Sequence, residues 1–76
     1  MAYNGHKSHA AWNVSLWINN DEGLYNMARG HLRRYGRTRD EAAAAMLSDL
    51  IEIGATHTPD GVPYTKTNIR LAMVGM

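Results

Sequence analysis

Five arginines lie within eleven consecutive residues, and they are the clearest sign of chemistry in this chain. They are Arg29, Arg33, Arg34, Arg37 and Arg39, and no acidic residue interrupts the run. An arginine side chain presents a planar fork of N–H donors that suits phosphate and carboxylate groups. The cluster therefore predicts a surface that binds a nucleic-acid backbone or an acidic protein surface. Cations late in a helix also complement the helix dipole, so an ordinary solvated face is the alternative interpretation.

Residue combinations typical of catalysis are missing from the sequence. There is no glycine-rich phosphate loop and no nucleophile paired with a base. His6 and His9 stand three residues apart without a third ligand nearby, and the chain has no cysteine. His31 falls on the apolar stripe of a predicted helix, where a histidine is more often a packed residue than a ligand. We therefore expect no enzyme activity, no cofactor and no metal site.

Length and composition limit the fold that can carry the arginines. With 76 residues the chain is too short for a nucleotide-binding α/β fold or a barrel, so we expect one small domain. A domain of this size buries only about 60% of the surface that its unfolded chain exposes, which makes self-association plausible. Without cysteine there is no disulfide, and no run reaches the roughly 20 apolar residues of a membrane span. These features predict a cytoplasmic protein.

The segment 12–18 fits two kinds of element. Trp12, Val14, Leu16 and Ile18 recur at every second position, which is typical of a half-buried strand. At helical spacing the same residues form a helix that is apolar nearly all round. No second strand is visible, and a lone strand would leave its backbone groups unpaired. We therefore expect a helix over about residues 8–18, and the alternative is an α+β fold whose strand at 12–18 pairs across a dimer.

Capping residues predict two helices after this segment. Asn19 with Glu22 is typical of a helix start, and Gly36 would end that helix. Thr38 with Glu41 forms a capping box for the next helix, which would run to Gly54.

A last helix is expected after a loop at residues 55–64, which contains both prolines. Thr65 is placed to cap it. The sequence thus predicts an all-α domain of four helices over residues 9–76, with a helix-turn-helix-like C-terminal half, after a flexible arm at residues 1–8. The side chains expected to provide most of the burial are Trp12, Trp17, Leu24, Leu32, Leu47, Leu50 and Ile69.

The last helix is apolar on two sides. Ile69 and Met73 share its inner face, whereas Leu71 and Val74 fall on the opposite face and Met76 follows near the end. A short helix with two apolar sides tends to bury one of them against another chain. We therefore expect a homodimer or a partner contact through residues 69–76.

The C-terminal half resembles the helix-turn-helix segment in the DNA-binding region of large serine recombinases. The residues that carry the resemblance are Gly54, Thr58, Pro59, Gly61, Tyr64, Thr65 and Arg70. The resemblance implies that early exposed residues of the last helix meet a DNA groove, and these residues are Lys66, Thr67, Asn68 and Arg70. The chain departs from the pattern at Asp60, where a basic residue is common, and this acid opposes close approach of a phosphate to the turn.

The N-terminal half resembles a family of short, uncharacterised proteins encoded by bacteriophages and other mobile elements. The matching residues are Trp12, Val14, Leu16, Trp17, Ile18, Asn20, Asp21, Gly23 and Tyr25. The chain has Ala10 and Ala11 where family members usually show Glu-Thr. The resemblance implies an accessory protein that acts in the cytoplasm of a host cell.

Three functions follow as hypotheses. The first is a small, non-catalytic phage-type protein that binds nucleic acid through the arginine cluster and the last helix. The second is a protein-binding inhibitor of a host or defence system, of the anti-CRISPR or anti-restriction type, whose arginines meet an acidic or nucleic-acid-binding host protein. The third is a virion or assembly component that acts through its apolar faces.

Overall fold

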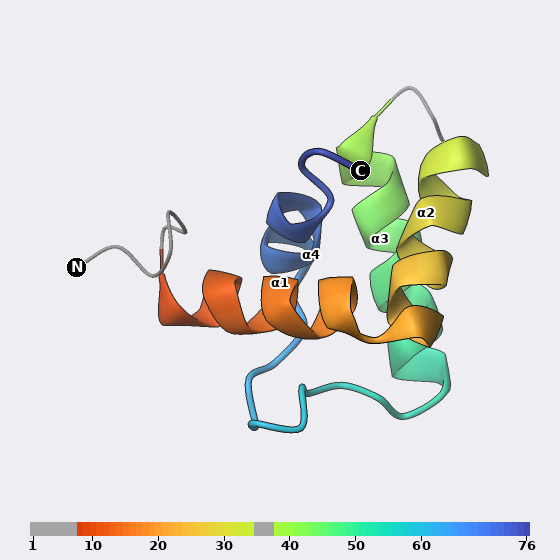
Figure 1. Cartoon of the computed structure of the whole chain (residues 1–76). Helices are drawn as coiled ribbons and strands as arrows, with labels where there is room; N and C mark the ends of the chain where they lie inside the picture. Colours follow the sequence, from red (N-terminus) through yellow and green to blue (C-terminus); the bar gives the residue numbers. More distant parts are fainter. Residues whose placement is uncertain (1–7, 35–37) are drawn as a thin grey trace.

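Helix-capping side chains set the elements of the fold. The computed structural model describes residues 8–34 and 38–76 (Figure 1). In these ranges it contains four helices and no strand: α1 (His9–Asn20), α2 (Glu22–Arg34), α3 (Arg39–Glu52) and α4 (Lys66–Ala72). The hydroxyls of Ser8, Thr38 and Thr65 each accept a hydrogen bond from the backbone N–H three residues later, at 3.1 Å. The predicted caps at Thr38 and Thr65 are confirmed, and so is the all-α fold.

The segment 12–18 lies entirely within α1, so the alternative of a strand paired across a dimer is wrong. The start of α2 also differs from the prediction, because the capping residue is Asp21 rather than Asn19. An oxygen of the Asp21 carboxylate accepts from the Leu24 N–H at 2.9 Å. Asn19 instead belongs to α1, where its side chain donates to the carbonyl of Ser15 at 2.9 Å. The predicted cap at Gly36 lies outside the described residues.

The helices cross one another in a single cluster (Figure 1). α1 packs against α2 and α4, and α3 packs against the same two helices. The connection between α2 and α3 is short, so the end of α2 and the start of α3 lie at the same end of the molecule (Figure 1). Gly54 ends α3 with a φ of +80°, a conformation that glycine adopts without steric cost, as predicted.

The core is built from smaller side chains than predicted. The largest fully buried apolar side chains are Val14, Ile18, Met46, Leu50, Ile69 and Met73. Leu50 and Ile69 are confirmed as core residues, but Trp12, Trp17, Leu24, Leu32 and Leu47 are only half-buried. Val14 and Ile18 form the inner face of α1. At about 100° per residue, Trp17 falls beside this face and Trp12 falls on the far side of the helix.

A polar network attaches the long connection at residues 53–65 to α1. Asn13 is only 2% exposed, and both the nitrogen and the oxygen of its side-chain amide form hydrogen bonds. Its nitrogen donates to the Asp60 carboxylate at 2.8 Å, and its oxygen accepts from the Thr58 hydroxyl at 2.6 Å. The indole N–H of Trp17 donates to the same Asp60 oxygen at 2.9 Å. The loop is therefore fixed by specific side-chain contacts over more than forty positions of sequence.

Candidate functional site

A cleft lies between the start of α3 and the end of α4. Its volume is about 380 Å³, and it is lined by Thr38, Arg39, Asp40, Arg70, Leu71 and Val74. Arg39 and Arg70 are both exposed. They are 31 positions apart in the sequence, and the packing of α3 against α4 places them on one cleft.

The only acid that lines this cleft already has a cationic partner. The Asp40 carboxylate accepts from the Lys66 ammonium group at 3.2 Å, and both side chains are about half exposed. Within residues 8–34 and 38–76, no arginine forms an ion pair with a carboxylate. The guanidinium groups of Arg39 and Arg70 are therefore available to an external anion.

The arginines of α2 divide into two groups. Arg33 and Arg34 are exposed at the end of α2, next to the start of α3 (Figure 1). Arg29 instead lies against Tyr25, donating to its hydroxyl at 3.0 Å with the guanidinium carbon 5.7 Å from the ring centre. Arg37 lies outside the described residues. We call Arg33, Arg34, Arg39 and Arg70 the basic end of the molecule.

The other predicted contact residues lie in different environments. Thr67 is exposed, Asn68 is half-buried, and Lys66 is engaged with Asp40. Of the four residues predicted on the last helix, which are Lys66, Thr67, Asn68 and Arg70, it is Arg70 that lines the cleft.

The apolar residues predicted for an interface also lie in different environments. Val74 is 62% exposed and lines the cleft together with the half-buried Leu71. Met76 packs against the protein's own core. Leu71 and Val74 are therefore the residues of this set that line the cleft.

One family model matches residues 1–76, the full length of the sequence. The chain belongs to DUF7249, a family of unknown function. No curated protein matches it, and no solved structure matches it. Membership of DUF7249 assigns no substrate or partner to the chain.

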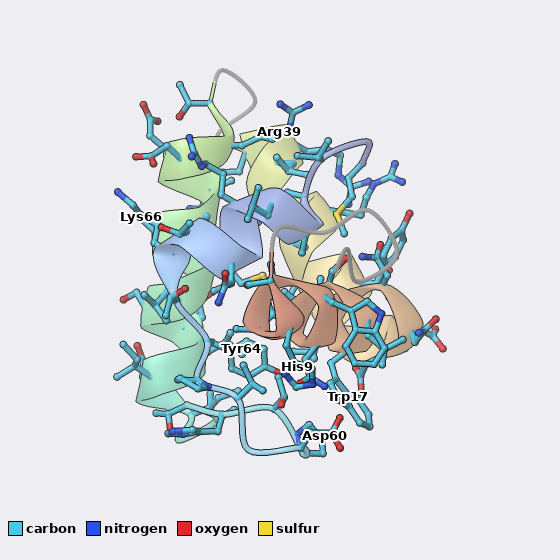
Figure 2. All side chains as sticks on the ribbon, turned by 90° about the vertical axis from the view of Figure 1, so that its left-hand side faces the viewer. His9, Trp17, Arg39, Asp60, Tyr64 and Lys66 are labelled. Carbon is cyan, nitrogen blue, oxygen red and sulfur yellow. The ribbon has the colours of Figure 1, made fainter. Side chains whose placement is uncertain are left out.

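Two titratable groups lie at the end of the molecule opposite to the basic end. Hydrogen bonds from Asn13 and Trp17 hold the pKa of the Asp60 carboxyl below its ordinary value of 3.8. Burial raises the pKa of the Tyr64 hydroxyl, so this group stays protonated at neutral pH. In Figure 2 both residues lie in the lower half of the molecule, whereas Arg39 lies at the top.

His31 has a structural partner. Its Nε2 lies 2.7 Å from the Asp49 carboxylate, an interaction that joins α2 to α3. This contact agrees with the interpretation of His31 as a packed residue. In the part of the chain that the structure describes, no three His, Cys, Asp or Glu side chains are grouped as a metal site would require.

A second hollow was missed by the sequence analysis. It has a volume of about 510 Å³ between the start of α2, the end of α3 and the following loop. Among its lining residues are Trp17, Leu24, Met27, Ile53 and Tyr64. The one local signal was the pair Ile51 and Ile53 at the end of α3, two large apolar side chains that remain exposed.

None of the helices within residues 8–34 and 38–76 has the length and apolar character of a membrane span.

Proposed function

We propose that this protein is a non-catalytic accessory protein that binds nucleic acid through its basic end. The observation that carries the proposal is the convergence of Arg39 and Arg70 on one cleft, with no carboxylate bound to either guanidinium group. Guanidinium groups bind phosphate oxygens with two parallel hydrogen bonds, and two of them on one cleft fit neighbouring phosphates of a backbone.

The surrounding cations extend this surface. Arg33 and Arg34 lie at the same end of the molecule, and Lys66 lies one helical turn before Arg70 on α4. Lys66 neutralises Asp40, which would otherwise repel a phosphate that enters the cleft. In this proposal the phosphate contacts supply most of the affinity, and Thr67 and Asn68 are the remaining candidates for contacts to bases.

Duplex DNA titrated at two salt concentrations tests the proposal. Binding should weaken steeply with salt, because each neutralised phosphate releases a condensed counterion. Replacing both Arg39 and Arg70 by alanine should reduce the slope of log affinity against log salt by roughly 0.9 for each lost contact. The matched control is Arg29→Ala, which also removes an exposed arginine but lies against Tyr25 outside the cleft.

Two results would overturn the proposal. One is the absence of binding to duplex and single-stranded nucleic acid at low salt. The other is an equal loss of affinity per removed arginine in the Arg29→Ala control and in the cleft variant, which would mean that net charge, not the cleft, is responsible.

An acidic protein surface is the second candidate partner, and the apolar part of the cleft favours it. Leu71 and Val74 line the cleft together with Arg39 and Arg70, and a surface that combines apolar side chains with arginines suits a protein interface. The protein would then inhibit a host or defence factor in the cytoplasm of a phage-infected cell. A host partner that remains bound after nuclease treatment, and is lost when Val74 is replaced by asparagine, would favour this function.

A further inference from the structure

The hollow between α2, α3 and the following loop is lined mainly by apolar residues, and among the described residues its one charged lining residue is the acid Asp21. Leu24, Met27 and Ile53 line it, and Ile53 is 67% exposed. Asp21 also lines it and is exposed. Exposed large aliphatic side chains on a small domain are typical of a contact surface. We call this hollow the acidic groove.

Its charge is of one sign. Besides Asp21, the exposed Asp60 lies at the groove, because its carboxylate accepts from the indole N–H of Trp17, which lines it. The exposed Glu22 and Glu52 adjoin Asp21 and Ile53 in the sequence. None of the lysines and arginines within residues 8–34 and 38–76 lines it. The hydrogen bonds to Asp60 lower the pKa of its carboxyl, so this acid is ionised at neutral pH.

The cleft at the basic end has the complementary composition. There Leu71 and the exposed Val74 lie beside Arg39 and Arg70. Each surface therefore combines aliphatic side chains with charged ones, and the charges left without an ionic partner have opposite signs on the two surfaces. Such a pair of surfaces is attracted electrostatically and buries apolar area on contact.

The two surfaces lie at opposite ends of α3. Arg39 is the first residue of this helix and Ile53 is its C-terminal capping residue. A rise of 1.5 Å per residue separates them by about 20 Å along the axis. One copy of the chain is therefore not able to bring its own two surfaces together.

We propose that the acidic groove binds the basic end of a second copy of this chain. The contact joins two different surfaces, so the assembly keeps one unused basic end and one unused acidic groove, at its two ends. A contact of this type is heterologous, and it forms chains that grow with concentration unless the geometry closes a ring. This differs from a symmetric dimer through residues 69–76, in which the same face of both copies would meet.

Two complementary variants test the proposal. Arg39→Glu combined with Val74→Asn disables the basic end, and Glu52→Lys combined with Ile53→Lys disables the acidic groove. The charged substitutions at Arg39 and Glu52 suit their positions, since an acid at the start of α3 and a cation at its end complement the helix dipole. All four positions are exposed, so folding should be retained. Arg29→Glu and Ser48→Lys, at exposed positions outside both surfaces, are the matched controls.

Sedimentation velocity over a range of concentrations distinguishes the outcomes. The unmodified protein and both controls should form species larger than a dimer as concentration rises, and high salt should shift this transition to higher concentration. Each disabled variant alone should need at least about tenfold more protein to associate, equivalent to roughly 1.4 kcal/mol. Mixed in equal amounts, the two variants should form a one-to-one dimer that grows no further, because one intact groove then meets one intact basic end.

Three results would overturn the proposal. They are a monomeric unmodified protein at high micromolar concentration, a mixture of variants that stays monomeric, and unchanged association of the groove variant alone, which would indicate a symmetric dimer. The inference does not rest on nucleic-acid binding. The groove variant keeps all four arginines of the basic end, so its affinity for duplex DNA tests the proposed function separately.

Discussion

Asn13 is a buried polar residue whose amide nitrogen and oxygen each form a hydrogen bond. Replacing it by alanine would leave the buried Thr58 hydroxyl without its acceptor and remove one donor from Asp60. Loss of one partner of a buried hydrogen-bonded group costs about 1–3 kcal/mol. We therefore predict that Asn13→Ala lowers the free energy of unfolding by that amount in urea titrations followed by tryptophan fluorescence. Asn20→Ala, an exposed change in the same helix, should stay within about 0.5 kcal/mol of the unmodified protein; equal losses in both variants would contradict the role of the network.

Asp60 couples the same network to pH. Its pKa is lower in the folded chain than its ordinary value of 3.8, so its ionised form favours the folded state. This contribution is fully present above the ordinary pKa and disappears as the pH falls through the lowered pKa. We predict that the melting temperature of the unmodified protein falls more steeply below about pH 4 than that of Asp60→Asn, which has no carboxyl to protonate. Parallel curves for the two proteins between pH 6 and pH 2 would show that Asp60 contributes nothing to the acid sensitivity.

At the scale of the element, α4 is short enough to depend on its cap. It has only seven residues, and the Thr65 hydroxyl satisfies one of its unpaired N–H groups. We predict that Thr65→Ala costs about 1 kcal/mol of stability and increases amide exchange across α4, whereas Thr67→Ala, at an exposed position inside the helix, has a small effect. Equal exchange rates in both variants would indicate that packing of Ile69 and Met73 alone holds the helix.

The sequence predicted the helices correctly where the interaction that starts a helix joins residues close together in the chain. Capping at Thr38 and Thr65 depends on a side chain and an N–H three residues away, and both caps were identified. The start of α2 was misplaced because Asn19 and Asp21 are both suitable caps, and the choice depends on the bond of Asn19 to Ser15. The link between Asn13 and Asp60 spans 47 positions, so no local pattern predicts it.

The candidate site was predicted only in part, because it also depends on contacts between positions that are far apart in the sequence. Residue type and spacing identified Arg39 and Arg70 as separate candidates, one from the cluster and one from the resemblance to recombinases. Their common cleft depends on the packing of α3 against α4, which is a tertiary property. Arg29 belongs to the same run of sequence but lies against Tyr25, because side chains four residues apart on a helix are neighbours.

At the scale of the whole molecule, charge is distributed unevenly between two ends. The basic end contains four arginines, and the acidic groove is lined by Asp21 and has Asp60 bonded to its lining residue Trp17. Both proposals use the basic end, one for phosphate groups and one for a second copy of the chain. The two partners should therefore exclude each other at this surface.

This exclusion gives a prediction for the two partners together. A short DNA duplex added to associated protein should convert it to DNA-bound monomers, because phosphates and the acidic groove compete for Arg39 and Arg70. Sedimentation of fluorescently labelled protein at constant concentration would show the sedimentation coefficient falling as duplex is added. An uncharged polymer of similar mass is the control for crowding. Assemblies that bind the duplex without shortening would place the phosphate contacts outside the cleft, on Arg33 and Arg34 alone.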